Sequence, residues 1–530
     1  MKVYSLARGQ ALAALLASIG GGLSFSSTPR AFGRPKGIAS HSTTAKANEE
    51  EMDASSLPLP PSLGMNLYRN VRDTLSYLSD SDRFVADRSG RLGPIFMGHL
   101  FFKPTVFCGG QEAVKEFITS AEAKASVTHP DLPESFMDLH TKWGALNMDI
   151  SEPMFKELRA LFGDTLSSRE ALDRYSIVAE KEIQTYVDEL TVRVRADPEQ
   201  PTYLAAELKS LCLQMFAKIF SGRGLTNEQE QQFIDYNAAL LSLSKNSNQY
   251  RKGVAALEDL RVEMLRRFRS LDDPNLPADT PGKWYHDQIF GRPNFDDEER
   301  ISTEIILFIW GAYVECASLM ADALALAHKN DIDLGRIREE HAARRASGLS
   351  PSDPAFWKAE ELAYTNGILR ESLRLYPPGA GVPRFGYEEF ALAGYRIPAG
   401  MPVMLEPRVG NRDPDLYADP ENFEPLRWVP PEAAEGESGC PFQGTALRQG
   451  LGSWFPGGHG AHQCPGVPLA EMVGRIFLTK MSVAFDSWTF NGEGLTKNGD
   501  IKYVKIPVRI PPDNFGMLFK LKDESTGTSL

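Results

Sequence analysis

The chain has 530 residues, of which 42% are hydrophobic and 24% charged, the composition of a globular protein with enough apolar residues for a large core. Acidic residues outnumber basic ones by 70 to 57, and the net charge of −13 argues against nucleic acid as a partner of the whole chain. The five cysteines are widely spaced and odd in number, which excludes a disulfide framework.

The first 48 residues form a segment without any Asp or Glu. Residues 11–25 are apolar and follow a basic start, with the length of a signal-peptide core and not of a membrane span. Residues 26–48 are basic and rich in Ser and Thr, as in a transit peptide. The two parts in series resemble the bipartite presequences of algae with complex plastids, in which cleavage precedes a Phe such as Phe32. We therefore predict a presequence over residues 1–48 and a plastid location; the alternative is an anchor in the membrane of the endoplasmic reticulum, followed by a linker.

The predicted elements then come in chain order. An acidic and then proline-rich linker covers residues 49–64, and residues 93–107 are typical of a strand pair. Between about residues 110 and 375, apolar residues recur every three or four positions, which predicts helices; the clearest are 170–195, 205–220 and 302–329. The last is apolar on nearly all sides, as expected of a central buried helix. Short strands come next, then a helix over about 466–485 and a β-rich tail. The fold class predicted is mainly α with a minor β part, in one large domain over residues 65–530.

The most informative stretch is SWFPGGHGAHQCPGVPLAE, residues 453–471, in which a lone cysteine, Cys464, ends a glycine-rich loop at the start of a helix. Three interpretations compete for this thiol. It is a buried structural cysteine, a member of a zinc site with Cys440, His459 and His462, or a ligand of a cofactor metal. One residue between His462 and Cys464 is poor spacing for structural zinc. A phosphate-binding loop is excluded, because no Lys-Ser/Thr comes after the glycines.

A helix upstream carries Glu371 and Arg374 one turn apart, where they can pair. This spacing alone is uninformative, because three other Glu-x-x-Arg pairs occur at 258/261, 263/266 and 424/427. The order of the motifs downstream of the pair carries the information. After the pair come the turn LYPP, the stretch GYRIPAGMPVM, the stretch NRDPDLYADPENFEPLRW with Arg427, and finally the glycine loop with Cys464.

In this order and spacing the chain resembles the cytochrome P-450 superfamily of haem-thiolate enzymes, over essentially residues 57–520. A weaker likeness in RLGPIFMGHLFFKPTVF is to the branch that oxidises retinoids and sterols. The resemblance implies that Cys464 is the axial ligand of the haem iron. It also implies that Glu371, Arg374 and Arg427 form a structural, buried ion-pair triad on the haem side of the fold.

Elementary chemistry agrees with this assignment of Cys464. A helix N-terminus offers free N–H groups and the positive end of the helix dipole, both of which stabilise a thiolate. Glycines, among them Gly460, let the backbone approach a flat ligand closely, and Pro468 suits a first helical turn. A thiolate ligand donates electron density to iron and favours O–O cleavage.

Haem also carries two carboxylates, which need cationic partners. The family's Trp-x-x-x-Arg helix corresponds to Phe155 and Arg159, with the Trp replaced. Arg384 and His462 match two other propionate-binding positions. The alternative for each of these three groups is a solvated surface charge.

Two departures from the family pattern stand out. The Phe expected seven residues before the cysteine is Gly457, which predicts a rearranged loop in which Phe455 or Trp454 packs against the haem. On the distal helix, the expected acid is Glu315, but the Thr that should come next is Cys316. A thiol is a weaker proton donor than a hydroxyl. Protons are then relayed by Glu315, a water or Ser318, or the enzyme does not activate O₂ itself.

The resemblance implies a haem-thiolate monooxygenase that oxidises a lipophilic, isoprenoid-like small molecule, with Glu315 and Cys316 as candidate catalytic residues. Its cofactor is haem b, with O₂ as co-substrate and NADPH electrons delivered by a separate reductase or ferredoxin. The replacement of Thr keeps open a reductase-independent lipid hydroperoxide isomerase or peroxygenase, and a haem carrier or sensor is the third hypothesis. The expected partners are the substrate and the electron donor; a monomer with peripheral membrane association is also expected.

Overall fold

The structure is a computed structural model. It describes residues 54–121, 125–126, 134–140, 150, 152–240, 242, 244–292, 295, 297–379, 381–430, 446, 453–505 and 508–522. The predicted presequence and Cys440, the distant member of the zinc alternative, lie outside the described residues.

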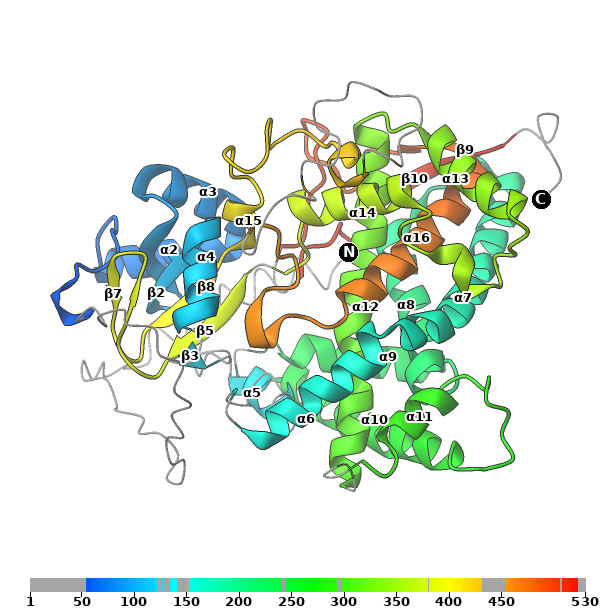
Figure 1. The fold of residues 1–530 in the computed structure, drawn as a ribbon, viewed down its shortest axis with the longest axis horizontal. Helices are drawn as coiled ribbons and strands as arrows, with labels where there is room; N and C mark the ends of the chain where they lie inside the picture. The colour runs from blue at the N-terminus through cyan, green and yellow to red at the C-terminus, as the bar shows by residue number, and fades with distance from the viewer. Residues whose placement is uncertain are drawn as a thin grey trace.

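A region rich in strands lies beside a much larger helical region, as Figure 1 shows. The helices of the described residues are α2 (Leu67–Ser79), α3 (Ser81–Leu92), α4 (Gln111–Glu116), α5 (Glu134–His140), α6 (Pro153–Phe162), α7 (Arg169–Ala196), α8 (Leu204–Ser221), α9 (Asn227–Leu240), α10 (Asn248–Ser270), α11 (Lys283–Ile289), α12 (Glu298–Lys329), α13 (Leu334–Ala346), α14 (Ala363–Leu375), α15 (Pro407–Gly410) and α16 (Val467–Ala484). The mainly helical fold class with a minor β part is confirmed.

The larger sheet has the strand order β1-β2-β8-β5-β3. Its strands are β1 (Ile95–Leu100), β2 (Lys103–Cys108), β3 (Ala125–Ser126), β5 (Val382–Gly386) and β8 (Pro402–Leu405). The predicted strand pair is the β1–β2 hairpin, with Ile95 opposite Cys108 and Leu100 opposite Lys103. The strand β8 joins β2 in parallel and β5 in antiparallel orientation, so the sheet unites the start of the domain with the segment between α14 and α15.

The remaining strands form two small sheets. The strands β4 (Thr202–Tyr203), β10 (Gly516–Leu521) and β9 (Phe485–Phe490) tie the C-terminal tail to the helical region, and β6 (Phe390–Leu392) pairs with β7 (Tyr395–Ile397). The second half of the predicted linker also lies against the sheet region. The N–H of Met97 donates to Pro61 O, and the N–H of Arg396 donates to Pro58 O, both at 2.8 Å.

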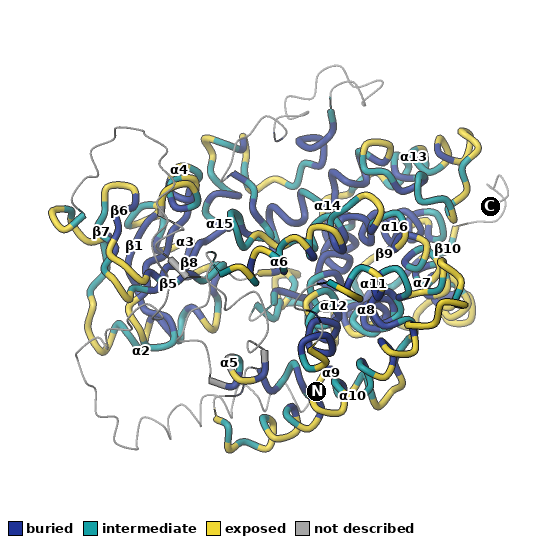
Figure 2. The backbone as a smooth tube through the Cα atoms, turned by 60° about the horizontal axis from the view of Figure 1, so that its bottom comes forward, coloured by how far each residue is buried: buried dark blue, intermediate teal, exposed yellow. Residues whose placement is uncertain are grey.

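The helix α12 runs through the middle of the helical region, beside α8, α14 and α16 (Figure 1). Figure 2 shows its buried backbone at the centre of the molecule. It begins four residues before the predicted start, because the side chain of Asp297 caps it by accepting from Arg300 N at 2.9 Å. It is long and apolar enough to cross a membrane, but its packing identifies it as the core helix of the fold.

Candidate active site at the Cys464 loop and helix α12

Tight backbone contacts define the loop that presents Cys464. The N–H of Cys464 donates to the carbonyl of Gly457 at 2.8 Å. A Cβ atom on Gly457 would lie 2.6 Å from Val467 Cγ2 and 3.0 Å from Cys464 Cβ, so the loop has no room for a larger residue there. Gly458 and Gly460 have φ angles of +75° and +77°, a conformation that favours glycine. The close turn of the loop on Cys464 explains why glycine replaces the Phe of the family pattern.

The Cys464 thiol lies at the N-terminus of α16. Burial is the largest influence on it and raises its pKa above the ordinary value, while the backbone N–H groups of Gly466 and Val467 act in the opposite direction. Cys464 is nevertheless an exposed residue. An exposed cysteine with many protein atoms around it is one that a ligand can reach. The helix N-terminus contributes as the sequence predicted, although its effect is smaller than that of burial.

The middle of α12 lies next to this loop, since the charge of Glu315 influences the Cys464 thiol and Cys464 influences the thiol of Cys316. Here the otherwise buried helix opens on one side. Gly311 is exposed, and a Cβ atom added to it would meet nothing within 4 Å. Val314, one turn further on, is partly exposed. The structure thus brings the Cys464 loop and an open, mostly apolar stretch of α12 together.

Glu315 lies on this opened stretch. Its Oε2 atom is buried and has no hydrogen-bond partner among the described residues. Burial raises the pKa of Glu315 to about 8, against the effect of a hydrogen bond from its own backbone. At neutral pH most of its carboxyl groups therefore hold a proton, as a general acid requires.

Cys316 lies on the same stretch of α12 but is buried. Burial, together with the nearby Cys212 of α8, raises the pKa of the Cys316 thiol well above its ordinary value. The thiol therefore stays protonated and packs between helices. This geometry suits a core residue better than the proton donor that the family's Thr provides, whereas Glu315 keeps the position of the acid.

Three basic side chains gather from three separate elements: Arg159 of α6, Arg384 of β5 and His462 of the cysteine loop. Arg384 is 1% exposed, and the His462 ring packs on Phe155 with centroids 4.4 Å apart. Burial and then the two arginine charges lower the pKa of His462 to about 3. The Nε2 atom of His462 is buried without a hydrogen-bond partner among the described residues. A partly buried cluster of three basic side chains beside an exposed cysteine fits a metal cofactor that carries carboxylates, as haem does.

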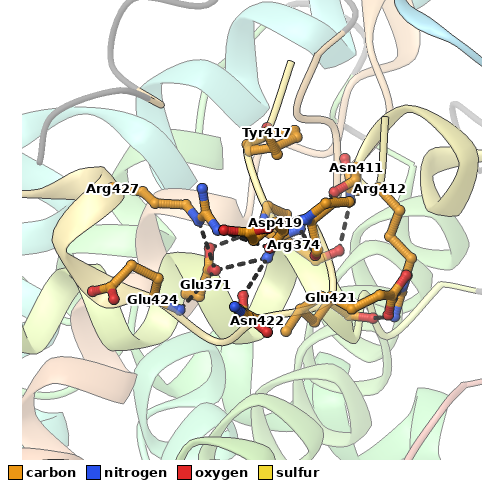
Figure 3. A network of polar contacts seen from close by, with 12 residues as sticks. Glu371, Arg374, Asn411, Arg412, Tyr417, Asp419, Glu421, Asn422, Glu424 and Arg427 are labelled. Carbon is orange, nitrogen blue, oxygen red and sulfur yellow. Dashed lines mark hydrogen bonds and ion pairs between the residues drawn. The ribbon is translucent and has the colours of Figure 1, made fainter. Parts of the chain in front are cut away.

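Figure 3 shows a second buried cluster, built around Glu371 of α14. The guanidinium of Arg374 donates to both carboxylate oxygens of Glu371, at 2.7 and 2.8 Å. Arg427 Nε donates to Glu371 Oε1 at 3.3 Å, and Trp428 Nε1 donates to Oε2 at 2.9 Å. The backbone N–H of Glu424 adds a bond of 3.0 Å to Oε1. The structure thus brings the three predicted triad residues together, and all three are buried.

The cluster also ties α14 to the segment that leads toward the cysteine loop. Arg374 donates to the carbonyls of Asn411, Pro420 and Asn422 at 2.7 to 3.0 Å, and Arg427 donates to Asp419 O at 3.0 Å. The Arg374 guanidinium also lies 4.8 Å from the ring centroid of Tyr417. Sequence reasoning missed Tyr417 and Trp428. Both aromatic residues lie within the stretch that carries Arg427, and this was the available signal.

Burial distinguishes this cluster from the two Glu-x-x-Arg pairs on α10. On α10, Glu258 pairs with Arg261 at 3.0 Å and Glu263 with Arg266 at 2.7 Å, and each pair includes an exposed side chain. Surface pairs of this kind add little to stability. The same local spacing therefore produces a structural network only where the fold removes it from water.

The two aromatic residues before the glycines have different surroundings. Phe455 is buried in the apolar cluster of the sheet region, and its ring centroid is 5.2 Å from that of His459. Trp454 packs against Trp428 at 5.2 Å and below the Arg370 guanidinium. These contacts join the loop to the sheet on one side and to the Glu371 cluster on the other.

A separate open groove of about 840 Å³ lies between α3, the start of α4 and the segment after α15. Its lining includes Arg83, Arg408 and Arg412 and none of the candidate site residues. The candidate active site therefore lies apart from this groove and is defined by its side-chain chemistry.

Comparison with known proteins agrees with this geometry. Residues 291–500, which include the Glu371 cluster, α12 and the cysteine loop, match the cytochrome P450 family model. The chain is 25% identical over 477 residues to human cytochrome P450 26C1, which covers 84% of this chain and 86% of the relative. It is 24% identical over 442 residues to the 3beta,22alpha-dihydroxysteroid 3-dehydrogenase of Arabidopsis thaliana, over 81% of this chain and 87% of that protein.

The fold is also that of a solved structure, a cyanobacterial CYP120A1 with bound retinoic acid. The TM-score is 0.71 at 21% sequence identity, and the match covers 88% of this chain and all of the other. The similarity extends well beyond the helices around α12 and includes both the sheet region and the helical region.

Proposed function

The chain belongs to the cytochrome P450 superfamily of monooxygenases, and from this premise we propose that it oxidises a lipophilic, isoprenoid-derived small molecule with O₂ and electrons from a separate donor protein. The product would be an alcohol or, after repeated oxidation, a carboxylate. The observation that carries the proposal is the reachable Cys464 thiol at a helix start, beside a protonated Glu315 on the opened side of α12.

Each candidate residue has a role in this proposal. Cys464 would hold the haem iron, and Arg159, Arg384 and His462 would bind the haem carboxylates. Gly460 would keep the loop backbone close to the ring. When bound, haem supplies the activation of oxygen, and its thiolate ligand favours O–O cleavage. Glu315 would hold a proton at its buried Oε2 atom. The rest of the protein would orient the substrate and exclude water.

The relatives support the class of substrate. The cyanobacterial protein binds retinoic acid, and the Arabidopsis protein is named for a dihydroxysteroid. Both molecules are isoprenoid in origin and largely apolar. The opened stretch of α12 has matching chemistry, since Leu307, Gly311 and Val314 offer no charge to a substrate. An apolar wall with one carboxyl group is typical of a site for a lipophilic molecule.

A second function is favoured by one observation, the burial of Cys316 against α8. Position 316 has no hydroxyl group that could deliver a proton. An enzyme that takes its oxygen from a lipid hydroperoxide needs neither this proton delivery nor a reductase. A hydroperoxide isomerase or peroxygenase is therefore the alternative candidate. A haem carrier or sensor, the third hypothesis, gains no support from the opened apolar side of α12.

One experiment separates these functions. The purified holoenzyme is incubated with retinoids, sterols and unsaturated fatty acids in three ways: NADPH with a reductase or ferredoxin system, hydrogen peroxide alone, and a fatty-acid hydroperoxide alone. We expect product only with the reductase system, with one oxygen atom from ¹⁸O₂. Rapid conversion of the lipid hydroperoxide without a reductase would overturn the proposal in favour of the alternative.

We also propose that the enzyme is a plastid protein whose presequence is removed on import, and that it works as a monomer with peripheral membrane association. The support is the acid-free segment over residues 1–48. A fusion of residues 1–55 to a fluorescent protein should enter plastids. Uniform reticular fluorescence without a plastid signal would instead favour the membrane-anchor alternative.

A further inference from the structure

A hydroxyl group that belongs to none of the sequence motifs contacts the cysteine loop. The side chain of Ser167 donates a hydrogen bond of 2.8 Å to the backbone carbonyl of Pro465, the residue that follows Cys464. The two bonded residues are 298 positions apart in the chain. The fold thus brings a neutral side chain from the helical region onto the peptide group next to the proposed iron ligand.

Ser167 ends a single π-helical turn, Gly163–Ser167, between α6 and α7. A hydrogen bond of 3.0 Å from the N–H of Ser168 to the carbonyl of Gly163 closes this turn, and the turn packs against α16. Turns of this kind are rare and occur frequently at functional sites. The turn therefore lies beside the residues with which α16 begins.

The neighbouring hydroxyl groups bond within their own segment. Thr165 Oγ1 donates to Leu161 O at 2.7 Å, a local bond that is common for Thr in a helix. Ser168 Oγ donates to Asp164 O at 2.5 Å, and the same oxygen caps α7. Both bonds contribute to local helix structure. The bond from Ser167 does not, because its acceptor lies in a different part of the chain.

The peptide group that Ser167 contacts also carries the N–H of Gly466. A peptide group is planar and conjugated, so the Pro465 carbonyl and the Gly466 N–H are two ends of one unit. Gly466 lies close to the sulfur, since a Cβ atom added to it would be 3.6 Å from Cys464 Sγ. Its N–H group acts as a hydrogen-bond donor to the Cys464 thiol. One peptide group therefore joins the Ser167 hydroxyl to the sulfur of Cys464.

A hydrogen bond at one end of a peptide group strengthens the bond made by the other end. A donor at the carbonyl oxygen draws electrons toward that oxygen, and the N–H hydrogen becomes more positive. The Gly466 N–H then withdraws more electron density from the sulfur, which donates less to a metal. Hydrogen bonds of this kind tune the reduction potential of thiolate-bound metals. Because Pro465 has no N–H, the N–H of Gly466 is the first one after the cysteine.

We propose that Ser167 is a positioning residue that raises the reduction potential of the haem iron through the peptide group of Pro465 and Gly466. This inference rests on the proposed role of Cys464 as the haem ligand. The Ser167 hydroxyl fixes and polarises this peptide group, and it transfers no proton or electron itself. Its effect favours acceptance of the electron that the donor protein supplies.

The first test measures the reduction potential of the purified holoenzyme in a redox titration followed by absorbance. Ser167→Ala should lower the equilibrium constant for one-electron reduction by roughly threefold, or about 28 mV at about 59 mV per tenfold change. Ser167→Thr keeps the hydroxyl and should restore the wild-type potential. The substitutions alter no charge, so the influence of Arg159 and Glu315 on Cys464 stays the same.

The second test is vibrational and does not depend on turnover. Resonance Raman spectra of Ser167→Ala should show a higher Fe–S stretching frequency than wild type, because the sulfur donates more strongly. The matched control is Ser168→Ala, which removes the neighbouring hydroxyl and the cap of α7. This control should lower the stability but keep the wild-type potential and Fe–S frequency. The same result in Ser167→Ala would mean a purely structural role and would overturn the inference.

The outcomes separate this inference from the proposed function. An unchanged potential in Ser167→Ala would overturn the role of Ser167 and leave the enzyme class intact. A wild-type holoenzyme without an Fe–S band would overturn the assignment of Cys464, and the inference with it. Should Ser167→Ala fail to bind haem, Ser167→Thr and Ser167→Val have the same shape and differ in the hydroxyl. Equal potentials in this pair would be decisive against the inference.

Discussion

The buried carboxyl groups of α14 and α12 have opposite surroundings. Glu371 of α14 accepts five hydrogen bonds, three of them from arginine side chains. On α12, Glu304, Glu315 and Asp322 each retain one oxygen atom with no partner among the described residues. Burial raises the pKa of these three groups to between about 7 and about 8.

The difference separates structure from proton chemistry. A buried carboxylate that is surrounded by charged donors holds its neighbours in place, since moving any one leaves another unpaired. A buried carboxyl group with too few donors prefers to stay neutral and gains or loses a proton near neutral pH. The Glu371 cluster therefore fixes the scaffold on the cysteine side, and α12 supplies the groups that can exchange protons.

The largest expected effect concerns the thiol of Cys464. Cys464→Ala should abolish the absorption band that reduced, carbon monoxide-treated protein shows when a thiolate binds the iron, because no other described cysteine is exposed. The control is Cys108→Ala, which removes a thiol buried in the sheet region and should keep the band. A band that persists in Cys464→Ala would refute the ligand assignment.

Next in size is the loss of one partner from the Glu371 cluster. Arg374→Ala leaves the carboxylate of Glu371 buried with fewer donors, which should lower the free energy of unfolding by roughly 3–5 kcal/mol and reduce haem incorporation. The matched control is Arg266→Ala, which breaks the exposed pair of the same spacing on α10 and should cost under about 1 kcal/mol. Urea unfolding monitored by circular dichroism measures both. Similar losses in the two variants would remove the contrast between buried and exposed pairs.

On α12, the acid should matter more than the thiol beside it. Glu315→Gln should lower the yield of product per NADPH and raise peroxide release by roughly tenfold or more, because the amide cannot deliver a proton. Cys316→Ser should change the yield much less, since the Cys316 side chain is buried close to Cys212 of α8. Peroxide and product assays with the holoenzyme give both values. A larger effect at position 316 would contradict the assignment.

The last comparison concerns the pH dependence of stability. A glutamate in the unfolded chain has a pKa of about 4.3, whereas that of Glu304 in the folded protein is about 8. Between these values the folded state binds the extra proton, so its stability falls as pH rises. Glu304→Gln should remove this contribution, up to about 1.4 kcal/mol per pH unit. Relative to wild type, the variant should gain stability from pH 5 to 8 in urea titrations; parallel curves would show that Glu304 ionises normally.

Sequence reasoning reached much of the fold and of the site. The helices α7, α8, α12 and α16 and the β1–β2 hairpin lie where periodicity predicted them, because a repeat of apolar residues decides which face is buried. The order of Glu371, Arg374, Arg427 and Cys464 was also readable. The surroundings of Asp322 could not be read from the sequence, because a single acid in an apolar helix has no pattern. Its hydrogen-bond partner Tyr503 is also 181 residues away.

The sequence by itself determined what is local: the thiol at a helix start, the glycines that a tight loop requires, the long apolar helix and the class of enzyme that their order indicates. The tertiary structure decided which buried carboxyl groups lack hydrogen-bond donors and which are surrounded by them. Four Glu-x-x-Arg pairs look alike in the chain, and only the fold withdraws Glu371 and Arg374 from water. Burial and long-range contacts set the strength of charges and the affinity for protons, and both depend on residues far apart in the sequence.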